Sequence, residues 1–123
     1  ILGVLNDKQL SDAYSNAIML ASISLIPESP SLVILEALAS NLPVVTYDIG
    51  ALPEATQFGK YAEITPIGNI ELLSDKLIKV LDLVIAGDYD SFNSRDEYIV
   101  DYCSPDLVLS KFINNYISLI NNE

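Results

Sequence analysis

Residues 25–54, LIPESPSLVILEALASNLPVVTYDIGALPE, carry the signals that decide the fold of this chain. Ser31 is a candidate N-cap for a helix whose apolar residues recur at the helical period, at Leu32, Leu35, Leu38 and Ala39. Pro43 ends this helix and begins a strand-forming run, PVVTY. The stretch therefore predicts a strand end, a polar turn, a buried helix, a second strand and a second loop.

Two acidic residues bracket the predicted turn and helix. Glu28 lies in the turn, and Glu36 lies eight residues later, inside the helix on the same side as Leu32. A carboxylate in an apolar helix needs a partner or a ligand, because burying an uncompensated charge is costly. The free N–H groups at the helix start, with the helix dipole, form a site for an anion such as phosphate. At about 1.5 Å per residue, Glu36 lies roughly 7 to 8 Å along the axis from Ser31. We therefore expect an anion and sugar hydroxyls to be bound side by side.

The acid pair, followed in order by EALASNLPVV and DIGALPE, resembles the donor-binding core of retaining, nucleotide-sugar-dependent GT-B glycosyltransferases (group 1, or family 4-like). The resemblance extends from LGVLNDKQLSDAYSNA near the start to YCSPDLVLSKFINNYISL near the end. It implies that Glu28 is catalytic and faces the transferred sugar, and that Glu36 hydrogen-bonds the ribose of the nucleotide.

The same resemblance implies roles for further residues. Ser29, Ser31 and Leu32, at the helix start, would meet the diphosphate, and the loop of Asp48, Gly50 and Leu52 would line the sugar. It implies no metal and no cofactor beyond the nucleotide-diphosphate sugar that serves as donor. The acceptor, a glycan, lipid or protein, would be held by an N-terminal lobe of the same parent chain. We expect a cytoplasmic protein in which any peripheral contact with a membrane is made by that lobe.

The chain departs from the family pattern in two places. Ser29, Pro30 and Ser31 stand where glycines often follow the first acid, and Pro30 also lacks an N–H donor. Asn41 and Leu42 replace the small residue usual before the PVV strand, although asparagine tolerates the left-handed conformation that glycine usually supplies. The alternative is therefore a non-catalytic nucleotide or nucleotide-sugar binding module of the same fold.

Composition excludes several classes of protein. The chain has 123 residues, half of them apolar, which suffices for the core of one domain. Its net charge of −11 argues against nucleic acid and anionic membranes as partners. Because histidine is absent, serine-triad, cysteine–histidine and zinc-enzyme interpretations fail. The lone Cys103 excludes an internal disulfide and fits a reducing compartment. We expect it to be a small packing residue near a helix start.

Strands are expected at residues 1–5, 18–26, 43–47 and 61–65. Helices are expected after Asn6 and Asp7, over residues 69–85, over 95–102 and from Pro105. The inner face of the first of these would contain Leu10, Ala13, Tyr14 and Ala17. This alternation predicts an α/β fold: a Rossmann-like parallel sheet flanked by helices, a partial C-terminal lobe of a GT-B fold. Because the chain starts without methionine, we interpret residues 1–123 as a fragment that lacks upstream strands and the acceptor lobe.

The predicted site contains acids but no cations. Residues 18–59 hold no lysine or arginine, so we expect the fragment alone to bind donor weakly and to be inactive. From spacing alone, Glu28 could also be a solvated loop acid, and Glu36 could cap a local network or point to solvent at the helix edge. Asp48 could be only a turn former, and Glu54 could be a favourable acid in the first turn of a helix. A purely structural α/β domain is the third interpretation.

Overall fold

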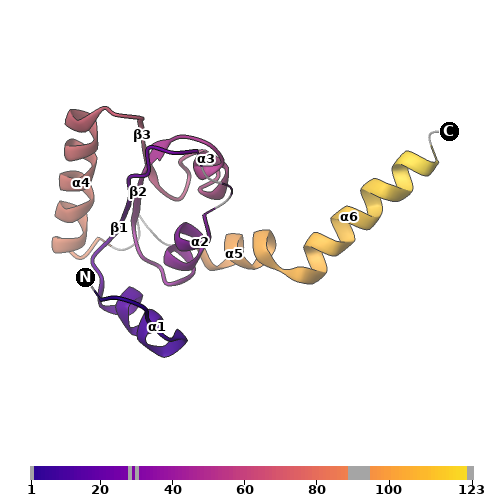
Figure 1. Cartoon of the computed structure of the whole chain (residues 1–123), viewed down its shortest axis with the longest axis horizontal. Coiled ribbons are helices and arrows are strands. Elements are labelled where there is room, and N and C mark those ends of the chain that lie inside the picture. Colours follow the sequence, from indigo (N-terminus) through magenta and orange to yellow (C-terminus); the bar gives the residue numbers. More distant parts are fainter. Residues whose placement is uncertain (1, 28, 30, 89–94, 122–123) are drawn as a thin grey trace.

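A parallel sheet runs through the middle of the molecule (Figure 1). The computed structural model describes residues 2–27, 29, 31–88 and 95–121. Within them the sheet has three strands in the order β1-β2-β3: β1 is Leu20–Ser22, β2 is Val44–Asp48 and β3 is Glu63–Pro66. Both neighbouring pairs are parallel. The predicted Rossmann-like α/β architecture is therefore confirmed.

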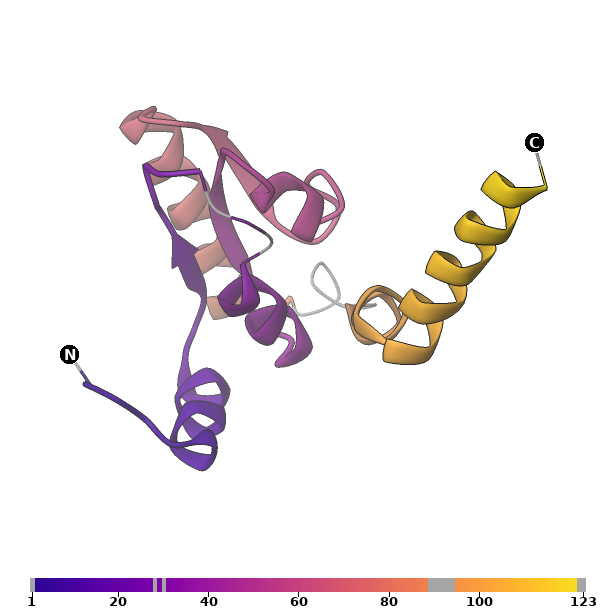
Figure 2. The ribbon, with the colours of Figure 1, turned by 45° about the vertical axis from the view of Figure 1, so that its right-hand side comes forward.

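The helices alternate with these strands. They are α1 Asp7–Asn16, α2 Leu32–Ala39, α3 Leu52–Ala55, α4 Ile70–Ile85, α5 Arg95–Cys103 and α6 Pro105–Ile120. Figure 1 shows α4 on one side of the sheet and α2 and α3 on the other, and in Figure 2 α4 lies behind the strands. The sheet is thus the middle layer of three.

The central strand β2 explains why both faces are covered. Its residues Val44, Val45, Thr46 and Tyr47 are all buried. Successive side chains of a strand point to opposite faces of the sheet. On one face, Val44 packs with Ile34 and Leu38 of α2. On the other face, Val45 and Tyr47 pack in a cluster with residues of α4, namely Leu73 and Val80. A strand buried on both faces is typical of parallel sheets between helical layers.

Two strand predictions were wrong, one over all of its described residues and the other in its extent. Residues 2–5 form no strand, and Leu2 and Val4 are exposed at 75% and 102%. The strand expected over residues 18–26 shortens to β1, whose three residues each pair with β2. Both differences have the same reason. A strand forms only where a neighbouring strand bonds to its N–H and C=O groups. Among the described residues, β1 has β2 as its neighbour on one side only.

Local signals explain where the helices begin and end. Asn6 and Gln9 form a reciprocal capping box at the start of α1. The end of α2 closes with two backbone bonds, from Asn41 N to Leu38 O at 3.0 Å and from Leu42 N to Ala37 O at 2.9 Å. Asn41 has a φ of +54°, as this helix-ending motif requires. Asn41 thus adopts the left-handed conformation that asparagine tolerates at a helix end.

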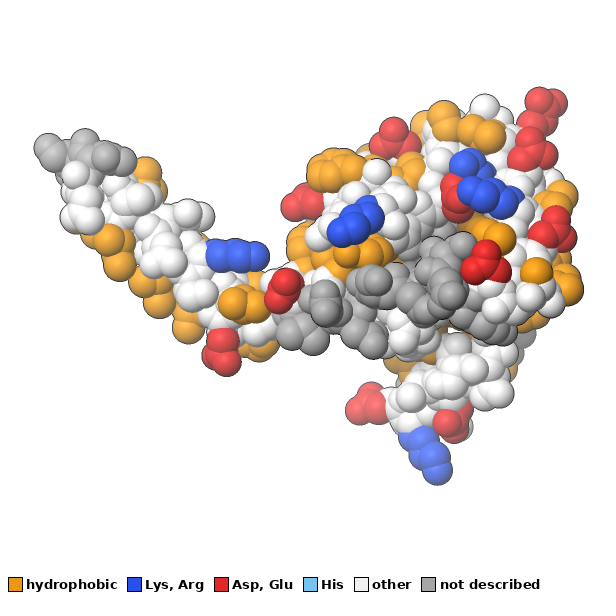
Figure 3. Space-filling model, turned by 180° about the vertical axis from the view of Figure 1, so that it is seen from behind, with side chains coloured by type: hydrophobic (Ala, Val, Ile, Leu, Met, Phe, Trp, Pro, Cys, Tyr) orange, Lys and Arg blue, Asp and Glu red, His pale blue; other side chains and the backbone are white. Residues whose placement is uncertain are grey.

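The last two helices differ in how they are packed. The side chain of Tyr98 in α5 is buried in the same core cluster as α2 and α3, whereas α6 projects away from the sheet (Figure 1). Hydrophobic side chains follow one side of α6 (Figure 3), and Phe112, Tyr116 and Leu119 are each more than 60% exposed. None of the described helices combines the length and the apolar character needed to cross a membrane.

Candidate functional site

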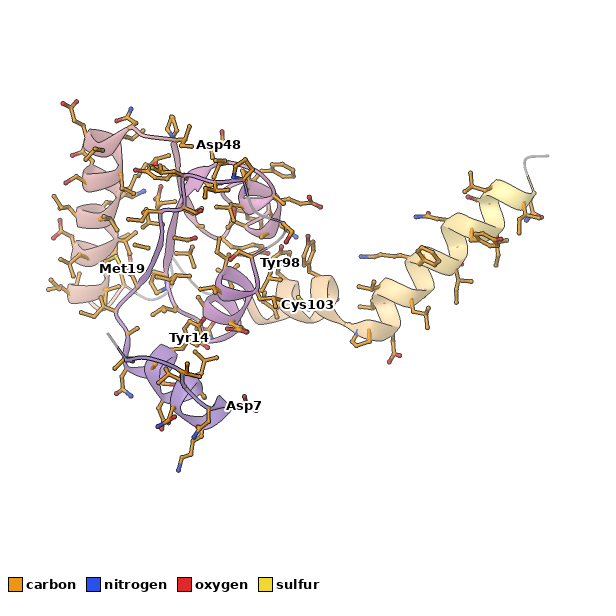
Figure 4. The ribbon with its side chains drawn as sticks, viewed as in Figure 1. Asp7, Tyr14, Met19, Asp48, Tyr98 and Cys103 are labelled. Atoms are coloured by element: carbon orange, nitrogen blue, oxygen red, sulfur yellow. The ribbon has the colours of Figure 1, made fainter. Side chains whose placement is uncertain are left out.

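The loops that follow β1 and β2 meet at one edge of the sheet, because the two strands are parallel neighbours. In open α/β sheets ligands bind at this carboxyl edge. The first loop leads through Ser29 and Ser31 into α2, and the second contains Gly50. Asp48, the last residue of β2, lies at this edge in Figure 4. The predicted catalytic Glu28 and its neighbour Pro30 lie outside the described residues.

The first turn of α2 has backbone N–H groups that the helix itself does not use. Ser31 occupies the N-cap position as predicted, but its side chain makes no capping hydrogen bond. Its carbonyl accepts from the N–H groups of Ile34 and Leu35 at 3.1 and 3.2 Å. The N–H groups of Leu32 and Val33 belong to the first turn and have no acceptor within the helix. Leu32 is 71% exposed, so a ligand can approach this helix end.

The loop after β2 is a tight turn. The N–H of Ile49 bonds to the carbonyl of Tyr47 at 3.1 Å, and the N–H of Leu52 bonds to that of Ile49 at 3.2 Å. Gly50 has a φ of +58°, which favours glycine. Buried Leu52 anchors the far side of this turn, while Asp48 and Gly50 are exposed. The backbone thus presents both predicted donor-binding residues to solvent.

Glu36 lies on the same side of α2 as Leu32, as the sequence predicted, but that side is exposed and does not face the core. Its Oε2 accepts a hydrogen bond of 3.0 Å from the hydroxyl of Tyr14 in α1. Burial, and then the hydrogen bond to Glu36 and its charge, raise the pKa of Tyr14 to about 12. The hydroxyl therefore stays protonated at neutral pH and remains a donor to the carboxylate.

Sequence reasoning missed this pair. It identified Glu36 as a carboxylate that needs a partner and placed Tyr14 on an inner helix face, but it did not join the two. The two residues are 22 positions apart, and the segment between them contains β1 and the whole loop before α2. No local pattern could have predicted the contact, because it depends on how α1 lies against α2.

A pocket of about 360 Å³ lies between α1 and α2. The residues around it are Asp7, Leu10, Ser11 and Tyr14 of α1 with Glu36, Ala39 and Ser40. Asp48 and Gly50 are not among them. Figure 4 shows Tyr14 beside α2 and Asp48 at the opposite end of the sheet. The structure therefore brings Glu36 together with α1 and separates it from the loop after β2.

Three lysines have partners away from this region. Lys76 and Lys79 in α4 form ion pairs with Glu63 of β3, and the Lys60 ammonium lies 4.9 Å from the ring centre of Tyr61. The N–H groups of the first turn of α2 are donors that the described part of the site offers to an anion. Within the described part of the chain, no three Cys, Asp or Glu side chains are placed to hold a metal ion.

Comparison with known proteins gives one family. The family model described as glycosyl transferases group 1 matches residues 1–96, which include every predicted site residue. No curated protein matches the chain. The match covers the sheet, α1 to α4 and both loops at the carboxyl edge.

Proposed function

The chain belongs to the glycosyl transferases group 1 family, as part of the C-terminal domain of a GT-B glycosyltransferase, and from this premise we propose that it binds a nucleotide-diphosphate sugar for retaining transfer. Glycosyl transfer is the general activity of the family. Donor binding by this chain, the residues that bind it and the retaining outcome are our proposal. The acceptor would be held by an N-terminal lobe of the same protein.

One observation supports this proposal above the others. The uncapped start of α2 lies at the carboxyl edge of the sheet, and Glu36 lies five residues further along the exposed side of the same helix. The N–H groups of the first turn would bind the diphosphate, and the helix dipole would favour its charge. Glu36, roughly 7 to 8 Å along the axis, would accept hydrogen bonds from the ribose hydroxyls.

The chemistry assigned to this chain is stabilisation of the leaving group and orientation of the sugar. Negative charge develops on the diphosphate as the bond to the sugar breaks, so donors at the helix start stabilise the transition state more than the ground state. By its place in the motif, Glu28 would face the transferred sugar. Asp48 and Gly50, in the loop after β2, would line the other side of the sugar.

The test is a transfer assay on the protein that contains this domain and its acceptor lobe. We expect transfer with retention of the anomeric configuration, read by NMR of the product. Substitution Glu28→Ala should lower turnover by at least about tenfold, whereas the control Glu71→Ala, at the start of α4, should leave it unchanged. An inverted product would contradict the retaining mechanism. Equal turnover in Glu28→Ala and wild type would contradict the role of Glu28.

A second candidate function is a non-catalytic binding module. The absence of lysine and arginine from residues 18–59 and the missing N–H at Pro30 favour it, because both weaken phosphate binding. This alternative predicts that a nucleotide sugar binds to the whole protein without release of nucleoside diphosphate. For the isolated chain, both functions predict weak binding and no turnover.

A further inference from the structure

Tyr14 is held more firmly than the carboxylate that it contacts. Its ring packs against the core cluster that contains Ile34 and Leu38, and the side chain is half-buried. Glu36 is exposed and has three side-chain torsions, so without a partner its carboxylate would sample several positions. Among the described residues, Tyr14 is the only one whose side chain hydrogen-bonds to the Glu36 carboxylate. The tyrosine hydroxyl therefore fixes where this carboxylate lies.

The hydrogen bond leaves room for a ligand. A carboxylate has two oxygens and about four acceptor sites, and Tyr14 occupies one site on Oε2. No other side chain of the described residues bonds to Oε1 or to the remaining site on Oε2, so both can accept from hydroxyl groups. Both residues line the pocket of about 360 Å³ between α1 and α2, a volume within the range of small-molecule sites.

We propose that Tyr14 is a positioning residue of the donor site: its hydroxyl holds Glu36 in the one orientation in which the carboxylate receives the ribose hydroxyls. This inference rests on the proposed function, because it assumes that Glu36 meets the ribose. It adds α1, and a residue outside the acid motif, to the donor site. Tyr14 acts through Glu36 and need not touch the nucleotide itself.

A purely structural role for Tyr14 makes different predictions. Replacing the hydroxyl would then change stability and leave ligand affinity alone. A positioning role predicts that the hydroxyl matters for ligands that carry ribose hydroxyls and only while Glu36 is present. Binding measured with and without those hydroxyls separates the two.

The experiment measures dissociation constants by calorimetry on the protein that contains this domain and its acceptor lobe. The probes are UDP, GDP and ADP and their 2′,3′-dideoxy forms. The proteins are wild type, Tyr14→Phe, Glu36→Gln and the double variant, with Tyr116→Phe on α6 as the matched control. Thermal melting verifies that each variant is folded.

We expect Tyr14→Phe to weaken binding of the preferred ribonucleotide about 3- to 10-fold, the effect of losing one hydrogen bond of typical net strength. It should not change binding of the dideoxy form, and in the Glu36→Gln background it should add little. Tyr116→Phe should bind as wild type does. The positioning role would be overturned if Tyr14→Phe bound the ribonucleotide with wild-type affinity, or if it lost the same affinity for both nucleotide forms. In either case, a loss of ribonucleotide affinity in Glu36→Gln would still uphold the donor site. Wild-type affinity in Glu36→Gln would overturn the assignment of Glu36 and this inference with it.

Discussion

The hydroxyl of Tyr98 in α5 donates a hydrogen bond of 2.8 Å to the backbone carbonyl of Ala55, the last residue of α3. The ring of Tyr98 is 3% exposed and stacks on Tyr61, with ring centroids 4.8 Å apart. A residue 43 positions further along the chain thus fixes the short helix that follows the loop of Asp48 and Gly50. The position of that loop depends on α5.

Tyr98→Phe should therefore destabilise the domain. The substitution keeps the aromatic stack but leaves the buried carbonyl of Ala55 without its donor, which costs about 1 to 2 kcal/mol of unfolding free energy. Urea unfolding measures the loss. Tyr116→Phe removes a hydroxyl from a side chain that is 62% exposed, so it should change stability by less than about 0.5 kcal/mol. Equal effects of the two substitutions would contradict the anchoring of α3 by α5.

The buried side of α2 predicts a contrast between two neighbouring positions. Ile34 is fully buried against the sheet, whereas Leu32 is 71% exposed. Ile34→Ala should lower the unfolding free energy by about 2 to 4 kcal/mol, because it leaves a cavity in the core. Leu32→Ala should cost less than about 0.5 kcal/mol. The same urea experiment applies, and a larger loss for Leu32→Ala would mean that α2 is rotated from the orientation described.

The end of α2 allows a test of backbone conformation. Asn41 is exposed and has a φ of +54°, so substitutions there change backbone strain and little else. Asn41→Gly should keep or slightly raise stability, and Asn41→Val should lower it by about 1 to 2 kcal/mol. Thermal unfolding of the two variants checks the order. A valine variant as stable as the glycine variant would exclude the left-handed conformation.

Glu63 predicts a pH dependence of stability. Burial alone would raise its pKa, but the hydrogen bonds and charges of Lys76 and Lys79 outweigh that effect and lower it below the ordinary value of 4.5. A carboxylate with a lowered pKa in the folded state stabilises fully above its unfolded pKa, and this contribution is lost as the pH falls through the folded pKa. The free energy of unfolding of wild type should thus exceed that of Glu63→Gln by a constant amount near neutral pH. This difference should shrink below about pH 4.5. If this difference in unfolding free energy grew on acidification, the stabilising role of the two ion pairs would be contradicted.

Much of the fold follows from local signals in the sequence. The capping residues Asn6 and Asn69 begin α1 and α4 at the predicted places, and the strand after Pro43 lies where its β-branched run predicts. The buried face of α2 was predicted only in part. Leu32, Leu35, Leu38 and Ala39 were expected inside, whereas the buried residues are Ile34, Ala37 and Leu38. Because seven of the eight residues of α2 are apolar, periodicity cannot determine which side faces the sheet.

Other predictions failed because they depended on contacts between distant elements. Cys103 lies near the start of α6, as expected, but it is the exposed last residue of α5 and does not pack in the core. Ala17, expected on the inner face of the first helix, is exposed beyond its end. The candidate site could likewise be predicted from the sequence only in part. Its motif residues are readable along the chain, but the bond between Tyr14 and Glu36 exists only once α1 and α2 have packed.

Glu36, as the residue that binds the ribose of the donor, is central to the proposed function. In the most direct test of this role, a panel of nucleotide-diphosphate sugars is added to the protein that contains this domain and its acceptor lobe. The release of nucleoside diphosphate is then measured for each donor. We predict release from one donor in wild type and in the control Glu71→Ala. In Glu36→Ala the KM for that donor should be raised about tenfold or more, as expected when hydrogen bonds to a charged group are lost. The same KM in Glu36→Ala and wild type would contradict the proposed donor site.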